Sequence, residues 1–248
     1  MCSPINCIRP ALLNKDGLEC WFTLRNETLN RSEAHIAGLN LGFNTEEKKS
    51  VIRQNRKQLL ELIGTDPEHF AFATQVHKTQ VEGVKAGGQF DDTDALVSAT
   101  PGIALAIQVA DCAAVLLGDS KNGVIGAVHA GWRGAVGNIV PKTISKIKAL
   151  GGQTSELKAF VSPCISLSKF EVGTEVASEF PSQFVDYTSY AKPHVDLKGF
   201  IKHQLNQQGI ADERIEVDSA CTISEEQFYS YRRQKNSSGR MMGIIKLS

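Results

Sequence analysis

The sequence predicts an α+β fold, with residues 1–248 forming a single domain of one mixed sheet and flanking helices. Strand-like and helix-like patterns are interleaved along the 248 residues, but without the regular alternation that a doubly wound parallel sheet requires. No internal repeat and no linker rich in Pro, Gly or Ser divides the chain. Its length is sufficient to bury one large core.

In the first half of the chain, one helix is expected before a series of strands. Residues 51–64, VIRQNRKQLLELIG, place apolar side chains on one helical face and end on Gly64, which can cap a helix. Residues 70–76, FAFATQV, alternate as in a half-buried strand. Further strands are predicted over residues 94–98, 102–110 and 113–119.

The middle of the chain predicts a hairpin followed by a helix. The strand at 113–119 and the β-branched, apolar run VIGAVHA at 124–130 are separated by the polar turn DSKNG, so we expect them to pair. A helix over residues 134–149 is expected next. Pro141 should either kink this helix or mark its true start.

The C-terminal part repeats the mixture of helices and strands. A helix is predicted over residues 196–210, closed by Gly209, and another over residues 224–233, opened by Ser224 as its cap. Strands are predicted over residues 157–163, 214–222 and 240–247.

Composition excludes several classes of partner. The 27 basic residues equal the 27 acidic ones, whereas a protein that binds nucleic acid through its backbone is usually basic. No apolar run approaches the length of a membrane helix, and the N-terminus lacks the apolar segment of a signal peptide. The six cysteines form no CxxC pair. We therefore expect a cytoplasmic protein with reduced thiols that binds no nucleic acid and no membrane.

Three strand ends each deliver one metal-binding side chain. His77 follows the alternating run at 70–76, Cys112 lies at a polar break between two apolar strands, and His129 lies near the end of 124–130. Taken singly, each is more often an ordinary surface or core residue. Together, one thiolate and two imidazoles suit zinc, and three protein ligands with one open position are typical of a catalytic site.

Two neighbours of these residues are candidates for catalysis. Asp111 precedes Cys112 inside an apolar run, where a carboxylate needs a partner. It could accept a proton, or it could receive the second N–H of a metal-bound histidine. Arg133 follows His129 in a glycine-rich turn, and a guanidinium buried there would face the open metal position and hold an anion. Trp132 is interpreted as core packing or as a wall of the site.

Six short motifs, from about Gly38 to the C-terminus, are similar to those of one bacterial family. In order they are TQVH, DALV, ADC, HAGWRG, SPCI…FEVG and FYSYRR…GRM. In them the chain resembles the proteins known as multicopper polyphenol oxidases or laccase-domain proteins, later described as purine nucleoside phosphorylases (YfiH-type). The resemblance implies a catalytic zinc on His77, Cys112 and His129. It also implies phosphorolysis of adenosine, inosine and 5′-methylthioadenosine, together with adenosine deaminase activity.

Substrate contacts are expected from three further residues in these motifs. Asn40 lies in GLNLGFNT, which resembles the family's NLG motif; a simple Asx turn is the alternative interpretation. Arg232 and Arg240 are candidates for holding phosphate. For Arg232 and its neighbour Arg233, a solvated helix end is the alternative. The predicted small-molecule partners are a nucleoside and phosphate, and the predicted assembly is a monomer or a homodimer.

The name laccase can be tested by counting ligands. Multicopper oxidases build their clusters from several His-x-His pairs, but this sequence has six histidines and no such pair. Cu²⁺ could still occupy the three-ligand site adventitiously, because it outbinds zinc at most nitrogen and sulfur sites. A copper-dependent polyphenol oxidase therefore stays as an alternative.

Two other classes also stay open. One is a metal-free cysteine hydrolase with Cys112 as nucleophile and His129 as base. It predicts activity that survives chelation and is abolished by thiol alkylation. The other is a non-catalytic binding or editing protein, for instance in cell-wall precursor metabolism, which would bind without turnover.

Overall fold

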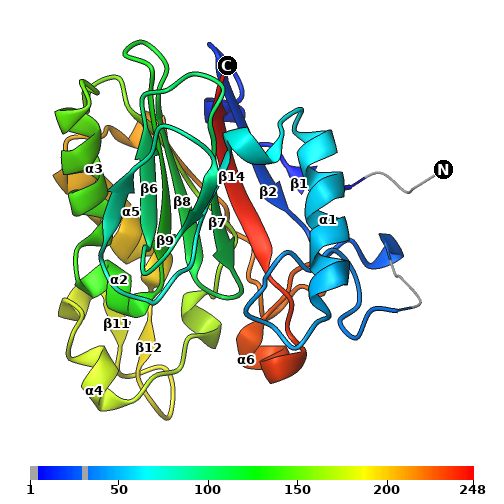
Figure 1. The fold of residues 1–248 in the computed structure, drawn as a ribbon. Coiled ribbons are helices and arrows are strands. Elements are labelled where there is room, and N and C mark those ends of the chain that lie inside the picture. The colour runs from blue at the N-terminus through cyan, green and yellow to red at the C-terminus, as the bar shows by residue number, and fades with distance from the viewer. Residues whose placement is uncertain (1–4, 30–32) are drawn as a thin grey trace.

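Two six-stranded sheets stacked on one another form the centre of the molecule (Figure 1). The structure is a computed structural model that describes residues 5–29 and 33–248. The first sheet has the order β1 (Cys7–Ile8), β2 (Leu18–Thr23), β14 (Met241–Leu247), β7 (Ala104–Val109), β3 (Phe70–Ala73) and β5 (Gly88–Phe90). The second has the order β13 (Ile215–Val217), β10 (Lys158–Val161), β8 (Ala113–Asp119), β9 (Val124–Ala130), β6 (Ala95–Ser98) and β4 (Val81–Gly83).

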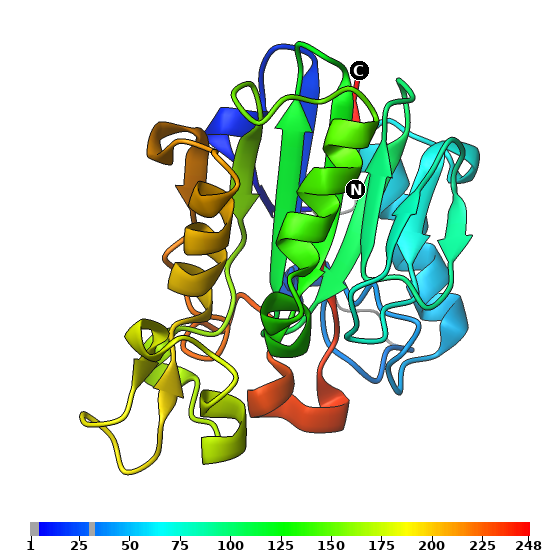
Figure 2. The same cartoon turned by 90° about the vertical axis from the view of Figure 1, so that its left-hand side faces the viewer.

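Helices cover the outer faces of both sheets. The first sheet is covered by α1 (Lys49–Leu62), and the second by α2 (Trp132–Val136), α3 (Ile139–Ala149) and α5 (Leu197–Gln207). Figure 2 shows α3 and α5 lying across the second sheet. The structure also contains a two-stranded sheet of β11 (Val185–Asp186) and β12 (His194–Val195), two short α-helices, α4 (Thr174–Ala177) and α6 (Tyr231–Gln234), and several 3₁₀ helices of three residues. Each large sheet has parallel and antiparallel neighbours, which confirms the α+β class.

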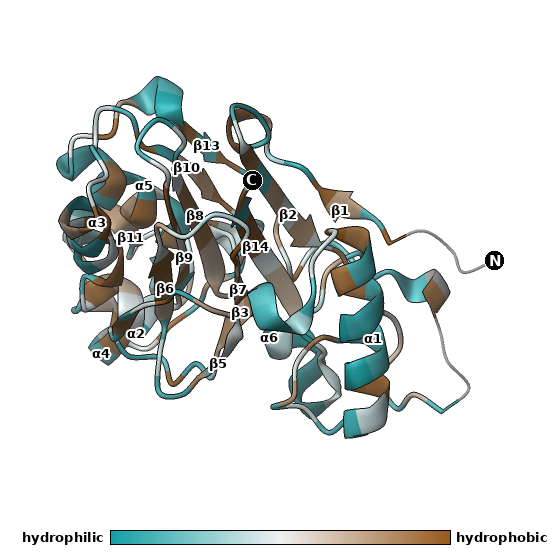
Figure 3. Cartoon of the chain, turned by 45° about the horizontal axis from the view of Figure 1, so that its top comes forward, coloured by the Kyte–Doolittle hydropathy of each residue, from teal (hydrophilic) through white to brown (hydrophobic). Residues whose placement is uncertain are grey.

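The core is divided into layers because each sheet is buried on both faces. The inner layer, between the sheets, contains Phe22, Leu105, Leu116 and Phe160. An outer layer packs α1 against the first sheet, and another packs α3 and α5 against the second. In Figure 3 the strands are largely hydrophobic in colour, whereas the helices carry hydrophilic residues toward the outside. Burial of apolar area on both sheets is the main stabilising term of such a fold.

Burial on both faces also corrects one detail of the sequence interpretation. The strand expected over 70–76 was predicted to be half-buried, but β3 ends at Ala73, and three of its four residues are buried. Ala71 and Ala73 pack in the inner layer, while Phe70 packs in the layer beneath α1. The expected hairpin is confirmed: β8 pairs antiparallel with β9 from Ala113↔Ala130 to Asp119↔Val124.

The helix predicted over residues 134–149 is two helices. Helix α2 ends at Val136, and α3 begins at Ile139 after Asn138, whose φ of 64° lies in the left-handed region. Pro141 occupies the first turn of α3, where its missing N–H costs no helical hydrogen bond. The break separates α2, which follows directly after the end of β9, from α3, which packs along the second sheet.

The helix predicted over residues 224–233 is wrong for most of its length. Residues 224–230 form turns, and only Tyr231–Gln234 are helical, with Ser230 Oγ accepting from the Arg233 N–H at 3.1 Å. Ser224 therefore caps no helix. The physical reason is tertiary: Phe228 and Tyr229 are fully buried in the inner layer, and the Tyr229 hydroxyl donates to the Ala37 carbonyl at 2.6 Å.

The strand and the helix predicted before residue 222 are both shorter than expected. The strand expected over 214–222 is regular only at Ile215–Val217, and the rest continues as a single bridge between Cys164 and Cys221. The helix that precedes it ends at Gln207, with Gly209 at φ 89° just beyond. Within the described ranges, no helix is both long and apolar enough to cross a membrane.

Candidate metal centre and its cavity

His77, Cys112 and His129 come together at one end of the two sheets. One ligand atom from each lies within 4.8 Å of the others, and the two imidazole rings meet edge to face with centroids 4.7 Å apart. His77 comes from the loop after β3 in the first sheet, Cys112 from the turn that leads from β7 into β8, and His129 from β9 in the second. The sequence therefore predicted their proximity correctly.

Two residues at the site adopt backbone conformations that side chains rarely take. His77 has φ 60° and Asp111 has φ 82°. Such left-handed positions in non-glycine residues persist where surrounding contacts hold them. At His77 the holding group is Asp94, whose carboxylate accepts from the backbone N–H groups of Val76, His77 and Lys78 at 3.3, 2.9 and 2.7 Å.

Asp94 also orients the second histidine. Its Oδ1 lies 2.8 Å from His129 Nδ1, and both residues are buried. That bond leaves Nε2 of His129 as the metal-binding nitrogen, the usual carboxylate–histidine arrangement of metal sites. One carboxylate thus positions two of the three candidate ligands. The signal was present in the sequence, because Asp94 is the charged residue that opens the apolar motif DALV.

The interpretation of Asp111 as the carboxylate partner of a histidine is wrong. Asp111 Oδ1 accepts from the Thr222 hydroxyl at 2.8 Å, and Oδ2 accepts from the Arg232 N–H at 2.6 Å. These bonds tie the C-terminal segment before β14 to the loop that carries Cys112. Asp111 still borders the cavity described below, so its proton-accepting role stays a prediction.

The three ligands form a polarised cluster when no metal is bound. Burial alone would raise the pKa of the Cys112 thiol, but the charge of His129 and hydrogen bonds from His129 and His77 lower it to about 6. Burial alone would lower the pKa of His129, but the Cys112 thiolate and Asp94 raise it to about 9. Without a metal, the two groups thus favour each other's charged forms, a thiolate and an imidazolium. Because thiolate and neutral imidazole are the ligand forms, metal binding must release a proton.

The donor set fits a metal that prefers nitrogen and sulfur. Two imidazoles and one thiolate converge within bonding reach of one ion, and three protein ligands leave a tetrahedral ion with one free position. In the described part of the chain, this is the one group of three such side chains close enough to share an ion. Gly131 is required beside it, because a Cβ there would lie 2.9 Å from Cys112 Sγ.

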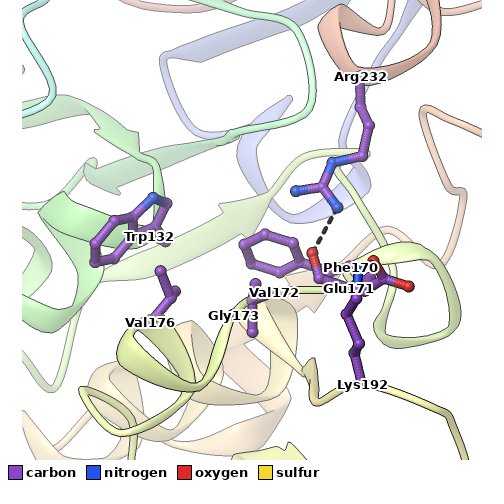
Figure 4. Close-up of a pocket in the computed structure, with 8 residues that line it drawn as sticks. All are labelled: Trp132, Phe170, Glu171, Val172, Gly173, Val176, Lys192 and Arg232. Carbon is purple, nitrogen blue, oxygen red and sulfur yellow. Dashed lines mark hydrogen bonds and ion pairs between the residues drawn. The ribbon is translucent and has the colours of Figure 1, made fainter.

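A cavity of about 1110 Å³ opens onto the three ligands. Cationic side chains outnumber carboxylates along its wall. The carboxylates are Glu46 and Asp111, and the cations are Arg56, Arg133, Arg232, Lys235 and Arg240. A smaller pocket of about 350 Å³ shares Trp132, Phe170 and Arg232 with it (Figure 4). The excess of positive charge favours an anionic ligand or co-substrate in the cavity.

Arg133 lines the cavity but is not buried. It lies on α2, which follows the strand that carries His129, and its Cζ stacks 4.3 Å from the centre of the Trp132 ring. The expectation of a buried guanidinium is therefore wrong. Trp132 packs against the outer core layer and borders the cavity as well, so both interpretations of this tryptophan hold. Stacking fixes the plane of the guanidinium and leaves its N–H groups available to a ligand.

Of the three other residues predicted to contact substrate, two line the cavity and one is buried behind it. Arg240 and Arg232 line the cavity. Burial lowers the pKa of Arg240, and Nη1 of Arg232 donates to the Glu171 carbonyl at 2.6 Å. Asn40 is fully buried: its Oδ1 accepts from the Gly42 and Arg240 backbone N–H groups, both at 3.0 Å, and its Nδ2 donates to Thr45. Asn40 thus forms an Asx turn with Gly42 and holds the backbone of Arg240 in place.

Comparison with known proteins assigns the chain to a class. Residues 19–248 match the family model described as multi-copper polyphenol oxidoreductase laccase. A protein of Deinococcus radiodurans named purine nucleoside phosphorylase is 39% identical over 219 residues, which cover 87% of this chain and 85% of the relative. One of the same name from Corynebacterium glutamicum is 34% identical, over 87% and 89% of the two chains.

Comparison with solved structures finds a protein that shares the fold of the chain. The Bacillus licheniformis hypothetical protein YfiH superposes with a TM-score of 0.86 at 26% identity and covers 93% of each chain. The chain belongs to the laccase-like family that the family model defines.

Proposed function

We propose that the protein is a zinc-dependent purine nucleoside phosphorylase that acts on adenosine, inosine and 5′-methylthioadenosine and also deaminates adenosine. The names of its relatives support the phosphorylase activity. The structural observation that supports it best is the His77–Cys112–His129 cluster at the wall of a cation-rich cavity. Such a cavity can hold an anionic co-substrate beside a metal site with an open position.

The residues of this chain supply most of the chemistry. His77, Cys112 and His129 would hold zinc, which supplies Lewis-acid chemistry at the open position, including activation of water for deamination. In phosphorolysis, a phosphate oxygen forms the new bond to C1′ of the ribose while the bond from C1′ to the purine nitrogen breaks. We assign Arg133, with Arg240 and Arg232, to hold the phosphate, because a guanidinium fork matches phosphate oxygens.

Asp111 is assigned a role in proton transfer. Its carboxylate lies at the cavity wall beside Cys112 and is held in place by Thr222 and the Arg232 backbone. A carboxylate fixed at that position can accept a proton from an attacking water during deamination. Phosphorolysis, whose nucleophile is already an anion, does not require this step.

The test is metal analysis together with nucleoside turnover. We expect one zinc per chain to co-purify, and inosine to be consumed in phosphate buffer but not in a phosphate-free buffer. Cys112→Ala and His129→Ala should each lose the metal and the activity, whereas Cys7→Ala, a thiol on β1 away from the cluster, should keep both. Stoichiometric metal in either cluster variant would contradict the site.

One observation favours a second candidate, a metal-free cysteine hydrolase. Cys112 as thiolate, His129 as imidazolium and Asp94 behind the histidine reproduce the nucleophile, base and orienting carboxylate of such enzymes. The two candidates differ in their response to reagents. Activity that survives exhaustive chelation and is abolished by iodoacetamide would favour the hydrolase, and activity restored to chelated protein by zinc would favour the phosphorylase.

A further inference from the structure

The cavity wall formed by α1 contains a buried arginine. Arg56 is 7% exposed and lines the cavity. Its guanidinium lies between two aromatic rings, with Cζ 4.3 Å from the centre of Phe43 and 4.1 Å from that of Phe72. Nε donates to the Leu41 carbonyl at 2.9 Å. The stem, the plane and one edge of the guanidinium are therefore fixed by the protein.

On the other edge of this guanidinium, the nitrogen Nη2 lacks a partner. Nη2 is buried without a hydrogen bond, and within the described ranges Arg56 forms no ion pair. Burial lowers the pKa of Arg56 to about 9. Leaving a buried donor of a charged group unpaired is costly. An arginine kept in this state at a cavity wall indicates an acceptor that arrives with the ligand.

A second unpartnered atom lies on the same cavity. Gln108 Oε1 is buried without a hydrogen bond, although Gln108 Nε2 donates to the Ala73 carbonyl at 3.3 Å. In the neighbouring amide of Gln75, by contrast, both the nitrogen and the oxygen have a partner, because the amide exchanges two hydrogen bonds with the Gln108 backbone at 2.6 and 2.8 Å. The wall of the cavity therefore contains one buried donor and one buried acceptor that lack hydrogen-bond partners within the protein.

This pair of groups suits a neutral polar edge better than a phosphate. Glu46, from the same loop as Phe43, also lines the cavity, and its carboxylate would repel a dianion. Arginine pairs with the carbonyl oxygen and N7 of an oxo-purine, and side-chain amides are the other common readers of base edges. Hypoxanthine and guanine present a carbonyl acceptor at position 6 and an N–H donor at position 1. Adenine presents an amino donor and a bare nitrogen there.

We propose that Arg56 and Gln108 recognise the 6-oxo edge of the purine base, Arg56 donating to the oxygen at position 6 and Gln108 accepting from N1–H. This inference rests on the proposed function, because it names the nucleosides that the same cavity prefers. Inosine and guanosine are then better substrates than adenosine, whose 6-amino donor would face the donors of Arg56. Arg56 is a specificity-determining residue that contacts the base.

The experiment measures binding of free bases, so that it does not depend on turnover. Hypoxanthine and 6-methylpurine, which lacks both the oxygen and N1–H, are titrated calorimetrically into the zinc-loaded full-length protein. We expect hypoxanthine to bind about tenfold more tightly. In Arg56→Met that preference should disappear through weaker hypoxanthine binding, with 6-methylpurine changed by less than about twofold. Arg53→Met, an exposed arginine on the same helix, should behave as the wild type.

Arg56→Lys provides a second variant that keeps the charge and the stem between the two rings but not the fork, in case Arg56→Met does not fold. It should also lose most of the preference. The proposal is overturned if the wild type shows no preference for hypoxanthine, or if the variants weaken both bases equally. It is also overturned if they raise KM for phosphate rather than for inosine, although phosphorylase function would then stand. A hypoxanthine preference without any phosphorolysis would instead overturn the proposed function alone.

Discussion

Asp94 is the residue on which two candidate ligands depend. Its carboxylate binds His129 Nδ1 and three successive backbone N–H groups that shape the His77 turn. Sequence reasoning found all three ligands because each is chemically distinctive. It assigned the supporting carboxylate to Asp111 on the basis of its adjacency to Cys112 and overlooked Asp94, the charged residue that opens the apolar motif DALV. Which acid faces which histidine is decided by strand register: β6 pairs with β9 from Ala95↔Val128 onward, which places Asp94 beside His129.

We predict that Asp94→Asn lowers metal affinity by roughly 10- to 100-fold, because the amide cannot accept as the carboxylate does from both the histidine and the turn. The measurement is competition for zinc with a chromogenic chelator. Asp119→Asn is the matched control, since Asp119 is also fully buried and also accepts backbone N–H groups, from Asn122 and Gln153. Unchanged zinc affinity in Asp94→Asn, or an equal loss in Asp119→Asn, would mean that Asp94 does not position the ligands.

Arg133 carries the second prediction at this scale. Arg133→Lys should keep the zinc and the fold but lose about 2–4 kcal/mol of transition-state stabilisation in phosphorolysis, the cost of removing one charge-stabilising donor. Adenosine deamination, which uses no phosphate, should fall much less. The two reactions are measured side by side on zinc-loaded protein. Equal losses would show that Arg133, stacked on Trp132, supports the site or the fold instead.

At the scale of secondary-structure elements, sequence patterns predicted correctly those elements that are stabilised by interactions between residues close in the sequence. The β8–β9 hairpin follows from two apolar runs and a turn that contains Gly123 at φ 65°. The segment 224–233 has a helical pattern, but two of its backbone carbonyls, those of Glu225 and Phe228, are bound by the side chain of Arg233. The same guanidinium also donates to the carbonyls of Thr222 and Ile223, which precede the segment. A side chain that satisfies four carbonyls stabilises turns in place of a helix.

We therefore predict that Arg233→Met destabilises the protein by about 1–3 kcal/mol, because several carbonyls lose their donor together. Arg232→Met, one residue earlier, removes one side-chain bond to Glu171 and should cost less. Thermal and urea unfolding of both variants measure the difference. If the two variants are equally stable, the Arg233 bonds do not hold the segment between β13 and β14.

At the scale of the whole molecule, the three side chains of the candidate metal centre come together because the two sheets are stacked. His77 leaves the first sheet, His129 belongs to the second, and Cys112 lies on the short crossing between them. The sequence could not show this arrangement. It predicted one mixed sheet, and it offered no pattern for β2, which pairs with β14 at the centre of the first sheet. The alternation of apolar and polar residues within one strand does not identify the distant strand with which it pairs.

The stacked architecture also limits how many metal ions one chain can hold. Besides His77 and His129, three described histidines are engaged elsewhere: His69 contacts Asp66, His194 donates to the Leu167 carbonyl and stacks on Tyr190, and His203 packs against Phe184. They do not converge on a shared position. A trinuclear copper cluster needs many imidazoles around one space, and the sequence has no His-x-His pair to supply them.

We predict that expression with abundant copper yields at most about one metal ion per chain, bound at the His77–Cys112–His129 cluster, and no multicopper oxidase activity. Elemental analysis and oxygen consumption with a phenolic substrate measure both. Cys112→Ala should abolish the copper retained, because Cys112 is the one thiolate of the cluster. Several copper ions per chain, together with an absorption band near roughly 600 nm typical of thiolate–Cu²⁺ centres, would contradict the prediction. A single copper ion that competes with zinc, by contrast, is what one three-ligand site with an open position should bind.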